Sequence, residues 1–222
     1  MQIYTILSNV YNLKSIMFDY NSYICAMNNN IAIETHPWQP FIPKNAKVLI
    51  LGTFPPKSSK WSMEFYYPNR INDFWRIIGL IFFHDKNHFY NETLKSFNLN
   101  GIKTFLIEKG IAVGDTALKV RRLKDNASDK FLEIVSPLPI LETISNMPSC
   151  MAIASTGEKA AQIIASETGS TVPALGKCTD TIIDNRLISI YRMPSTSRAY
   201  PLSIDKKAEY YLSMFKSIGI FH

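Results

Sequence analysis

The chain has 222 residues, of which 46% are hydrophobic and 19% are charged. This length allows one ordinary domain to bury most of its apolar surface, and the composition excludes an intrinsically disordered chain. With 24 basic and 18 acidic residues the net charge is +6, which permits a polyanionic partner without requiring one.

Cysteine usage and hydropathy narrow the class of protein further. Cys25, Cys150 and Cys178 are odd in number and form no CxxC motif, which disfavours a structural zinc site or an iron–sulfur cluster. We expect reduced thiols in a cytoplasmic protein. No apolar run approaches the ~18 residues of a membrane span, and the first residues lack the pattern of a secretory signal. The four histidines show neither metal-ligand spacing nor a catalytic triad.

The first part of the chain leads into a buried strand. Residues 1–34 are expected to be an N-terminal extension, and residues 35–222 a single domain. Within that domain, the proline-rich segment Thr35–Pro43 precedes a strand at Val48–Leu51, whose unbroken apolar run is typical of burial on both faces. The turn Gly52–Pro56 ends this strand, because two successive prolines allow neither a helix nor a sheet ladder.

Helical and strand patterns alternate along the rest of the chain. Helices are predicted over Asn72–Phe83, His88–Phe97, Gly101–Lys109, Asp115–Arg122 and Ser155–Ser166, the last with a capping box at Ser155 and Glu158, and after an N-cap at Ser203. Strands are predicted at Ile111–Val113, Leu132–Val135, Cys150–Ala154 and Leu187–Tyr191. The alternation predicts an α/β fold with a mostly parallel central sheet between helices.

Two loops directly follow predicted strands: Gly52–Pro56 and Met193–Ser197. Ligands of open α/β sheets bind outside the carboxyl ends of the strands. We therefore expect the two turns to face each other across a crevice. Tyr67, from an aromatic cluster, and Asn72, at a helix start, are expected to line its floor.

These segments resemble the motifs of the uracil-DNA glycosylase superfamily, nearest its branch of hypoxanthine-DNA glycosylases and mismatch-specific thymine/uracil glycosylases. The matching segments are Gly52–Pro55, Tyr67, Asn72–Trp75 and Pro194–Ser197, with a middle region at 110–122 and 126–129. The resemblance implies a three-layer α/β/α sandwich with a mostly parallel four-stranded sheet. It further implies a monomeric, monofunctional glycosylase of base excision repair that hydrolyses the N-glycosidic bond of a flipped uracil or hypoxanthine in double- or single-stranded DNA, without metal, cofactor or membrane.

The resemblance also implies roles for individual residues. The catalytic candidates are Asn72, Asp73 and Asp129. The base-binding candidates are Thr53, Phe54, Pro55, Tyr67 and Met193. The DNA-binding candidates are Lys57, Ser195, Thr196, Ser197, Arg198 and Tyr200, with Lys60, Arg70, Arg121 and Arg122 as further phosphate contacts. Cations, hydroxyls and backbone amides are the groups that bind phosphate oxygens.

Each main candidate has a chemical and a structural interpretation. A base outside the duplex stack needs an aromatic face, which Tyr67 supplies, with Tyr66 in reserve. Negative charge grows on the leaving base, so the Asn72 amide is expected to stabilise that charge or to orient water, and Asp73 and Asp129 to activate the water. The alternatives are core packing for the tyrosines, a helix N-cap for Asn72, and first-turn or solvated charges for the aspartates.

Two positions depart from the superfamily pattern. Phe54 stands where many members carry Asp or Asn, and Met193 where many carry His or Asn. The hypoxanthine branch lacks these groups too, and the resemblance implies that the asparagine at position 72 takes over their role. The departures favour, as an alternative, a catalytically weak or inactive DNA-binding protein of the same fold. A third interpretation is a small-molecule α/β enzyme that uses the same crevice.

Overall fold

The computed structural model describes residues 31–124 and 129–221. Most of the expected extension over residues 1–34, and the matched residues 126–128, therefore lie outside the described residues. The central sheet has the strand order β5-β2-β8-β10-β9. Its strands are β2 (Val48–Gly52), β5 (Ile111–Asp115), β8 (Ala152–Ser155), β9 (Cys178–Ile183) and β10 (Arg186–Arg192).

The sheet contains one strand more than the resemblance implies. Strands β5, β2, β8 and β10 run parallel, and β9 pairs antiparallel with β10 at the edge. Sequence patterns missed β9 because Cys178–Ile183 buries only its last residue, so it contains no apolar run. The expectation of four strands is therefore corrected to five.

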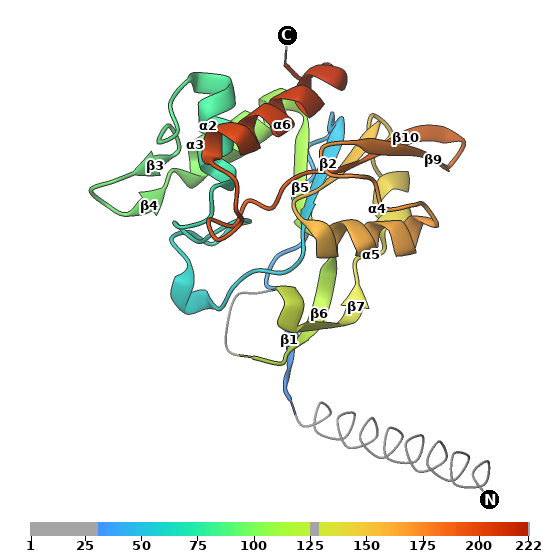
Figure 1. The fold of residues 1–222 in the computed structure, drawn as a ribbon, viewed down its shortest axis with the longest axis horizontal. Coiled ribbons are helices and arrows are strands. Elements are labelled where there is room, and N and C mark those ends of the chain that lie inside the picture. Colours follow the sequence, from blue (N-terminus) through green and yellow to red (C-terminus); the bar gives the residue numbers. More distant parts are fainter. Residues whose placement is uncertain (1–30, 125–128, 222) are drawn as a thin grey trace, which may run out of the picture.

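Helices cover both faces of this sheet (Figure 1). On one face lie α2 (Phe74–Phe83), α3 (Leu99–Lys109) and α6 (Ile204–Ser217), and on the other α4 (Ile140–Ser145) and α5 (Glu158–Thr168). Because side chains alternate along a strand, Val48 and Ile50 join the first apolar layer, and Leu49 and Leu51 join the second. None of the helices in the described ranges is long and apolar enough to cross a membrane.

A smaller antiparallel sheet extends from the end of β5. It has the order β1-β6-β7, with β1 (Ile33–Thr35), β6 (Ala117–Arg122) and β7 (Leu132–Pro137). The helix predicted over Asp115–Arg122 is wrong, because Ala117, Val120 and Arg122 are buried and β6 pairs with strands on both sides. Arg121 and Arg122 bind Glu133 and Glu34, so neither is retained as a phosphate contact.

Turn chemistry overrides one further prediction. The helix expected over His88–Phe97 is instead a short hairpin of β3 (Tyr90–Asn91) and β4 (Ser96–Phe97). Its turn is stabilised by the Leu94 amide, which donates to Asn91 Oδ1, and Lys95 has a φ of 51°.

The expected capping box at Ser155 is also wrong. Ser155 ends β8, and its hydroxyl donates to the carbonyl oxygen of Tyr191. Helix α5 begins three residues later, after Gly157. By contrast the N-cap at Ser203 is confirmed, since its Oγ accepts a hydrogen bond from the Lys206 amide.

Candidate active site

A cavity of about 730 Å³ opens at the carboxyl ends of the parallel strands. The turn after β2 contributes Gly52–Pro56 to its wall, and the turn after β10 contributes Ser195–Pro201. Tyr67 and Asn72 line the same cavity. Both turns therefore face one space, as the sequence predicts. The five candidates of the second turn line it: Ser195, Thr196, Ser197, Arg198 and Tyr200.

Tyr67 is held in a strained backbone conformation beside the cavity. Its φ is 54°, in the left-handed region that non-glycine residues rarely adopt. Its ring stacks on Phe74 with the centroids 3.9 Å apart, and its hydroxyl lies 3.3 Å from Thr156 Oγ1. Burial raises the pKa of Tyr67 well above its ordinary value, and the Asp115 carboxylate adds to this effect. One ring face is thus covered by Phe74, and the side chain also lines the cavity.

Tyr66, the reserve aromatic, occupies a different place. It is 1% exposed and belongs to the apolar layer under α2 and α6. Its ring stacks on His36 with the centroids 5.5 Å apart. Tyr66 does not line the cavity and is a core residue, which was the alternative interpretation.

Asp115 is a cavity carboxylate that sequence reasoning missed. It is the last residue of β5, it lines the cavity, and its Oδ2 lies 2.9 Å from Nε2 of the buried His36 ring. Burial raises the pKa of Asp115, while the hydrogen bond from His36 opposes the rise. The signal that could have found Asp115 is its position directly after an apolar strand; His36 had no such signal, because its partner is distant in sequence.

Gly52 makes room for Asp115. A Cβ atom at this position would stand 2.3 Å from Asp115 Oδ1 and 3.4 Å from the Tyr67 hydroxyl oxygen. The glycine is therefore needed for the close approach of a buried carboxylate and not only for the turn.

Gly52→Ala should destabilise the protein by about 1–3 kcal/mol, because the buried Asp115 carboxylate must move. Urea unfolding of the purified variant measures this loss. Gly114→Ala in the neighbouring strand is the control, since its Cβ would meet a flexible Leu51 methyl group at 3.1 Å and should cost less. Equal stability of the two variants would contradict the assigned role of Gly52.

Asp129 brings a second carboxyl group to the cavity. It starts the short 3-10 helix Asp129–Phe131, and its Oδ2 accepts a hydrogen bond of 2.8 Å from the Thr53 hydroxyl. Burial raises the pKa of Asp129, and the negative charge of Asp115 raises it further. The Thr53 hydroxyl, Lys159 and Arg122 act in the opposite direction. Two carboxyl groups that repel each other therefore share one cavity.

Asn72 presents an amide to the cavity from the start of α2. Its Oδ1 accepts a hydrogen bond of 2.9 Å from the Phe74 amide, which orients the side chain. No acceptor for its Nδ2 occurs among the residues that the structure describes. The N-cap of α2 is Asp73, so the N-cap expected at Asn72 is wrong, but the Asn72 oxygen still accepts from the first turn of the helix. This bond leaves the Nδ2 atom of Asn72 able to donate into the cavity.

Three candidates lie elsewhere. Asp73 lines a neighbouring cavity, where Lys207 and Arg198 bind its carboxylate, so we no longer assign it to water activation. Met193 is 1% exposed and packs in the apolar layer instead of lining the cavity. Lys57 is exposed as the N-cap of the 3-10 helix Ser58–Lys60; it does not line the cavity, although the preceding Pro56 does.

The remaining base-binding candidates lie on the cavity wall. Thr53 and Pro55 are buried there, and Thr53 is bonded to Asp129. Phe54 also contributes to the wall, but its ring packs edge-on against His36 at 5.4 Å and therefore helps to fix that imidazole.

Comparison with known proteins gives a structural match and no sequence match. No protein-family model matches the chain, and no curated protein matches it either. The chain is similar to the solution NMR structure of "a putative Uracil DNA glycosylase from Methanosarcina acetivorans", with a TM-score of 0.56 and 20% sequence identity. The match covers 85% of this chain and 99% of the other. The protein described here therefore has the mixed α/β fold of that solved structure.

Proposed function

We propose that the protein is a DNA glycosylase of the uracil-DNA glycosylase superfamily, nearest the hypoxanthine branch, that removes uracil or hypoxanthine from DNA in base excision repair. It would act as a cytoplasmic monomer without metal or cofactor. The observation that carries the proposal is one cavity at the strand ends that combines the strained Tyr67 ring, the Asn72 amide and two carboxyl groups. The fold shared with the Methanosarcina structure supports it.

Recognition begins with a nucleotide that leaves the duplex. The flipped base stacks on the free face of Tyr67, whose other face is held by Phe74. The loop Ser195–Tyr200 binds the flanking phosphates through hydroxyls, backbone amides and Arg198. The net charge of +6 favours the approach of DNA.

Hydrolysis then requires an activated water and a stabilised leaving base. Asp129 accepts a proton from the attacking water while the oxygen of that water bonds to C1′ of the sugar. The bond from C1′ to the base nitrogen breaks, and its electron pair stays on the base, which takes up a proton from solvent. The Asn72 amide donates to the base or to the water as charge develops. Asp129 thus provides the carboxylate that Phe54 does not, from a position bonded to the neighbouring Thr53.

The pH dependence should reflect the coupled carboxyl groups. A general base works in its ionised form, so base release should be lost as the pH falls through the raised pKa of Asp129. Asp115→Asn removes a negative neighbour, which lowers the pKa of Asp129 and should shift the acid limb to lower pH. Single-turnover rates across the acidic range measure the shift. An acid limb that moves upward or stays in place would contradict this coupling.

The direct test is a panel of labelled duplexes containing uracil, inosine, xanthine or mismatched thymine. Incubation with the purified protein, followed by alkaline cleavage of abasic sites, should reveal base release from the uracil or inosine substrate. Salt-sensitive binding to DNA without release from any substrate would instead identify an inactive DNA-binding protein of this fold. Binding of a free nucleobase or nucleotide without affinity for DNA would point to a small-molecule enzyme.

A further inference from the structure

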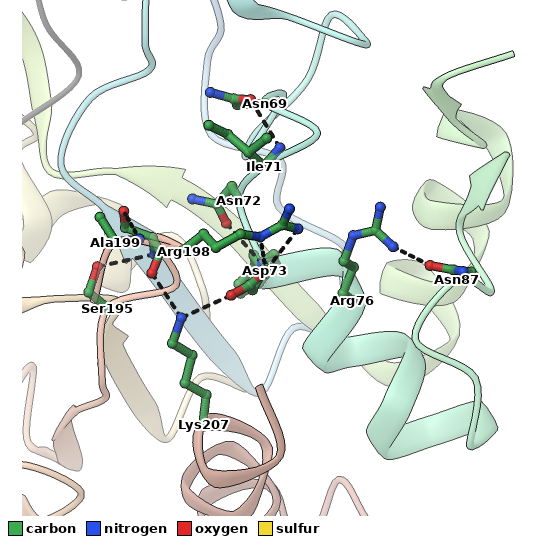
Figure 2. Close-up of polar contacts among 12 residues, drawn as sticks. Asn69, Ile71, Asn72, Asp73, Arg76, Asn87, Ser195, Arg198, Ala199 and Lys207 are labelled. Carbon is green, nitrogen blue, oxygen red and sulfur yellow. Dashed lines mark hydrogen bonds and ion pairs between the residues drawn. The ribbon is translucent and has the colours of Figure 1, made fainter. Parts of the chain in front are cut away.

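Lys207 is a buried cation in the C-terminal helix α6. Its side chain is 0% exposed, and its Nζ donates hydrogen bonds of 2.9 Å to Asp73 Oδ2 and 2.8 Å to the carbonyl oxygen of Ser197. An ammonium group without water around it is stable only where it is paired and hydrogen-bonded. In Figure 2 it lies between the start of α2 and the segment Ser195–Ala199.

The loop is attached to the rest of the fold through several backbone carbonyl groups. The Pro194 carbonyl accepts a hydrogen bond of 3.0 Å from the Tyr211 hydroxyl, one turn after Lys207 on the same face of α6. The Thr196 carbonyl accepts a hydrogen bond of 2.8 Å from the Asp73 amide, and Asn72 pairs with Ser197 in an antiparallel bridge. Lys207 contacts both the loop, at the Ser197 carbonyl, and the Asp73 carboxylate.

Arg198 also binds Asp73, but less tightly. Its Nε and Nη2 atoms lie 3.2 Å from Asp73 Oδ1, and its side chain is 52% exposed. Exposed ion pairs contribute little because water screens them and a long side chain loses rotamer freedom. The buried Lys207 is therefore the cation that sets the position of Asp73, whereas the half-exposed Arg198 can exchange its bonds to Asp73 for a DNA phosphate.

We propose that Lys207 is a positioning residue for base release. Its ammonium group links the loop Ser195–Tyr200 to the start of α2 and holds the loop against Asn72, so that both keep their places on the cavity wall. This proposal rests on the proposed glycosylase function. Lys207 touches neither the base nor the sugar, and acts through Asp73 and Ser197.

The test compares Lys207→Met with Lys206→Met. Both variants remove an ammonium group from α6, but Lys206 is exposed and pairs with Glu209 on the same helix. In Lys207→Met, backbone amide exchange of the loop Ser195–Tyr200 should become about tenfold faster, while exchange in the central strands stays unchanged. The single-turnover rate of base release should fall about 10- to 100-fold, with a much smaller change in affinity for intact duplex DNA. Lys206→Met should match the unmodified protein in all three measurements.

The outcomes separate this proposal from the glycosylase function. Equal loop exchange in the two variants, or faster exchange throughout the protein in Lys207→Met, would overturn the positioning role, the second because it indicates a general structural role. If no deaminated base is released by the unmodified protein, the glycosylase function fails, but the exchange comparison still decides whether Lys207 positions the loop. If Lys207→Met does not fold, Asp73→Asn takes its place, since it removes the negative charge that pairs with the buried ammonium group and so breaks the link from the loop to α2; unchanged loop exchange there would overturn the proposal.

Discussion

Asp129→Asn should lower the single-turnover rate of base release by about 10²–10⁴-fold, the usual contribution of a positioned general base. Asparagine keeps the size of the side chain and an oxygen that accepts from the Thr53 hydroxyl, so the local structure should persist. What is lost is the ability to take a proton from the water. Affinity for duplex DNA that contains the substrate base should change little, because Asp129 acts on the water and not on the phosphates.

Asp180→Asn is the matched control for this experiment. Asp180 also accepts a hydrogen bond from a hydroxyl, that of Ser189, but it lies on the exposed edge strand β9. Its substitution should leave base release unchanged. A rate in Asp129→Asn within a few-fold of the unmodified protein would remove Asp129 from the mechanism.

Asn72→Ala should lower the rate of base release by roughly 10²–10³-fold, as expected for the loss of one preorganised donor to developing negative charge. The substitution also removes the hydrogen bond that the Phe74 amide makes at the start of α2, which costs about 1 kcal/mol of stability. The rate and the free energy of unfolding must therefore be measured on the same preparations.

Two further variants separate the donor role of Asn72 from its role in the helix turn. Asn72→Asp keeps an oxygen for the Phe74 amide but has no amide donor, so it should be stable and nearly as slow as the alanine variant. Asn98 is the N-cap of α3, and its Oδ1 accepts a hydrogen bond of 3.0 Å from the Gly101 amide. Asn98→Ala should therefore reduce stability without slowing base release. Full activity of Asn72→Asp would show that the helix turn is what matters.

The elements that the sequence predicts correctly are those formed by interactions between neighbouring residues. The strand Val48–Leu51 and the N-cap at Ser203 depend on residues that are adjacent in sequence, and both were predicted. Strand β6 forms because partners on both sides pair with it, and β9 because β10 does. Such pairings leave little periodic pattern of apolar residues in the strands themselves. The sequence therefore predicts a helix in place of β6 and no strand at β9.

The same contrast between neighbouring and distant residues applies to the candidate site. Glycine and proline residues after the apolar strands were sufficient to predict two turns on one crevice, whereas the resemblance to the glycosylase superfamily indicated Tyr67, Asn72 and Asp129. The partner of Asp115 is 79 residues away and that of Asp73 is 134 residues away, so neither pairing was visible along the chain.

Local residue chemistry was enough to establish the α/β class, the positions where strands end, and the residues around them. The folded chain alone revealed that His36 supports Asp115 in the cavity, that Lys207 binds Asp73 outside it, and that Met193 is buried in the core. Turns follow from the backbone preferences of neighbouring residues, whereas the pairing and burial of a charge depend on which distant segments are packed against it.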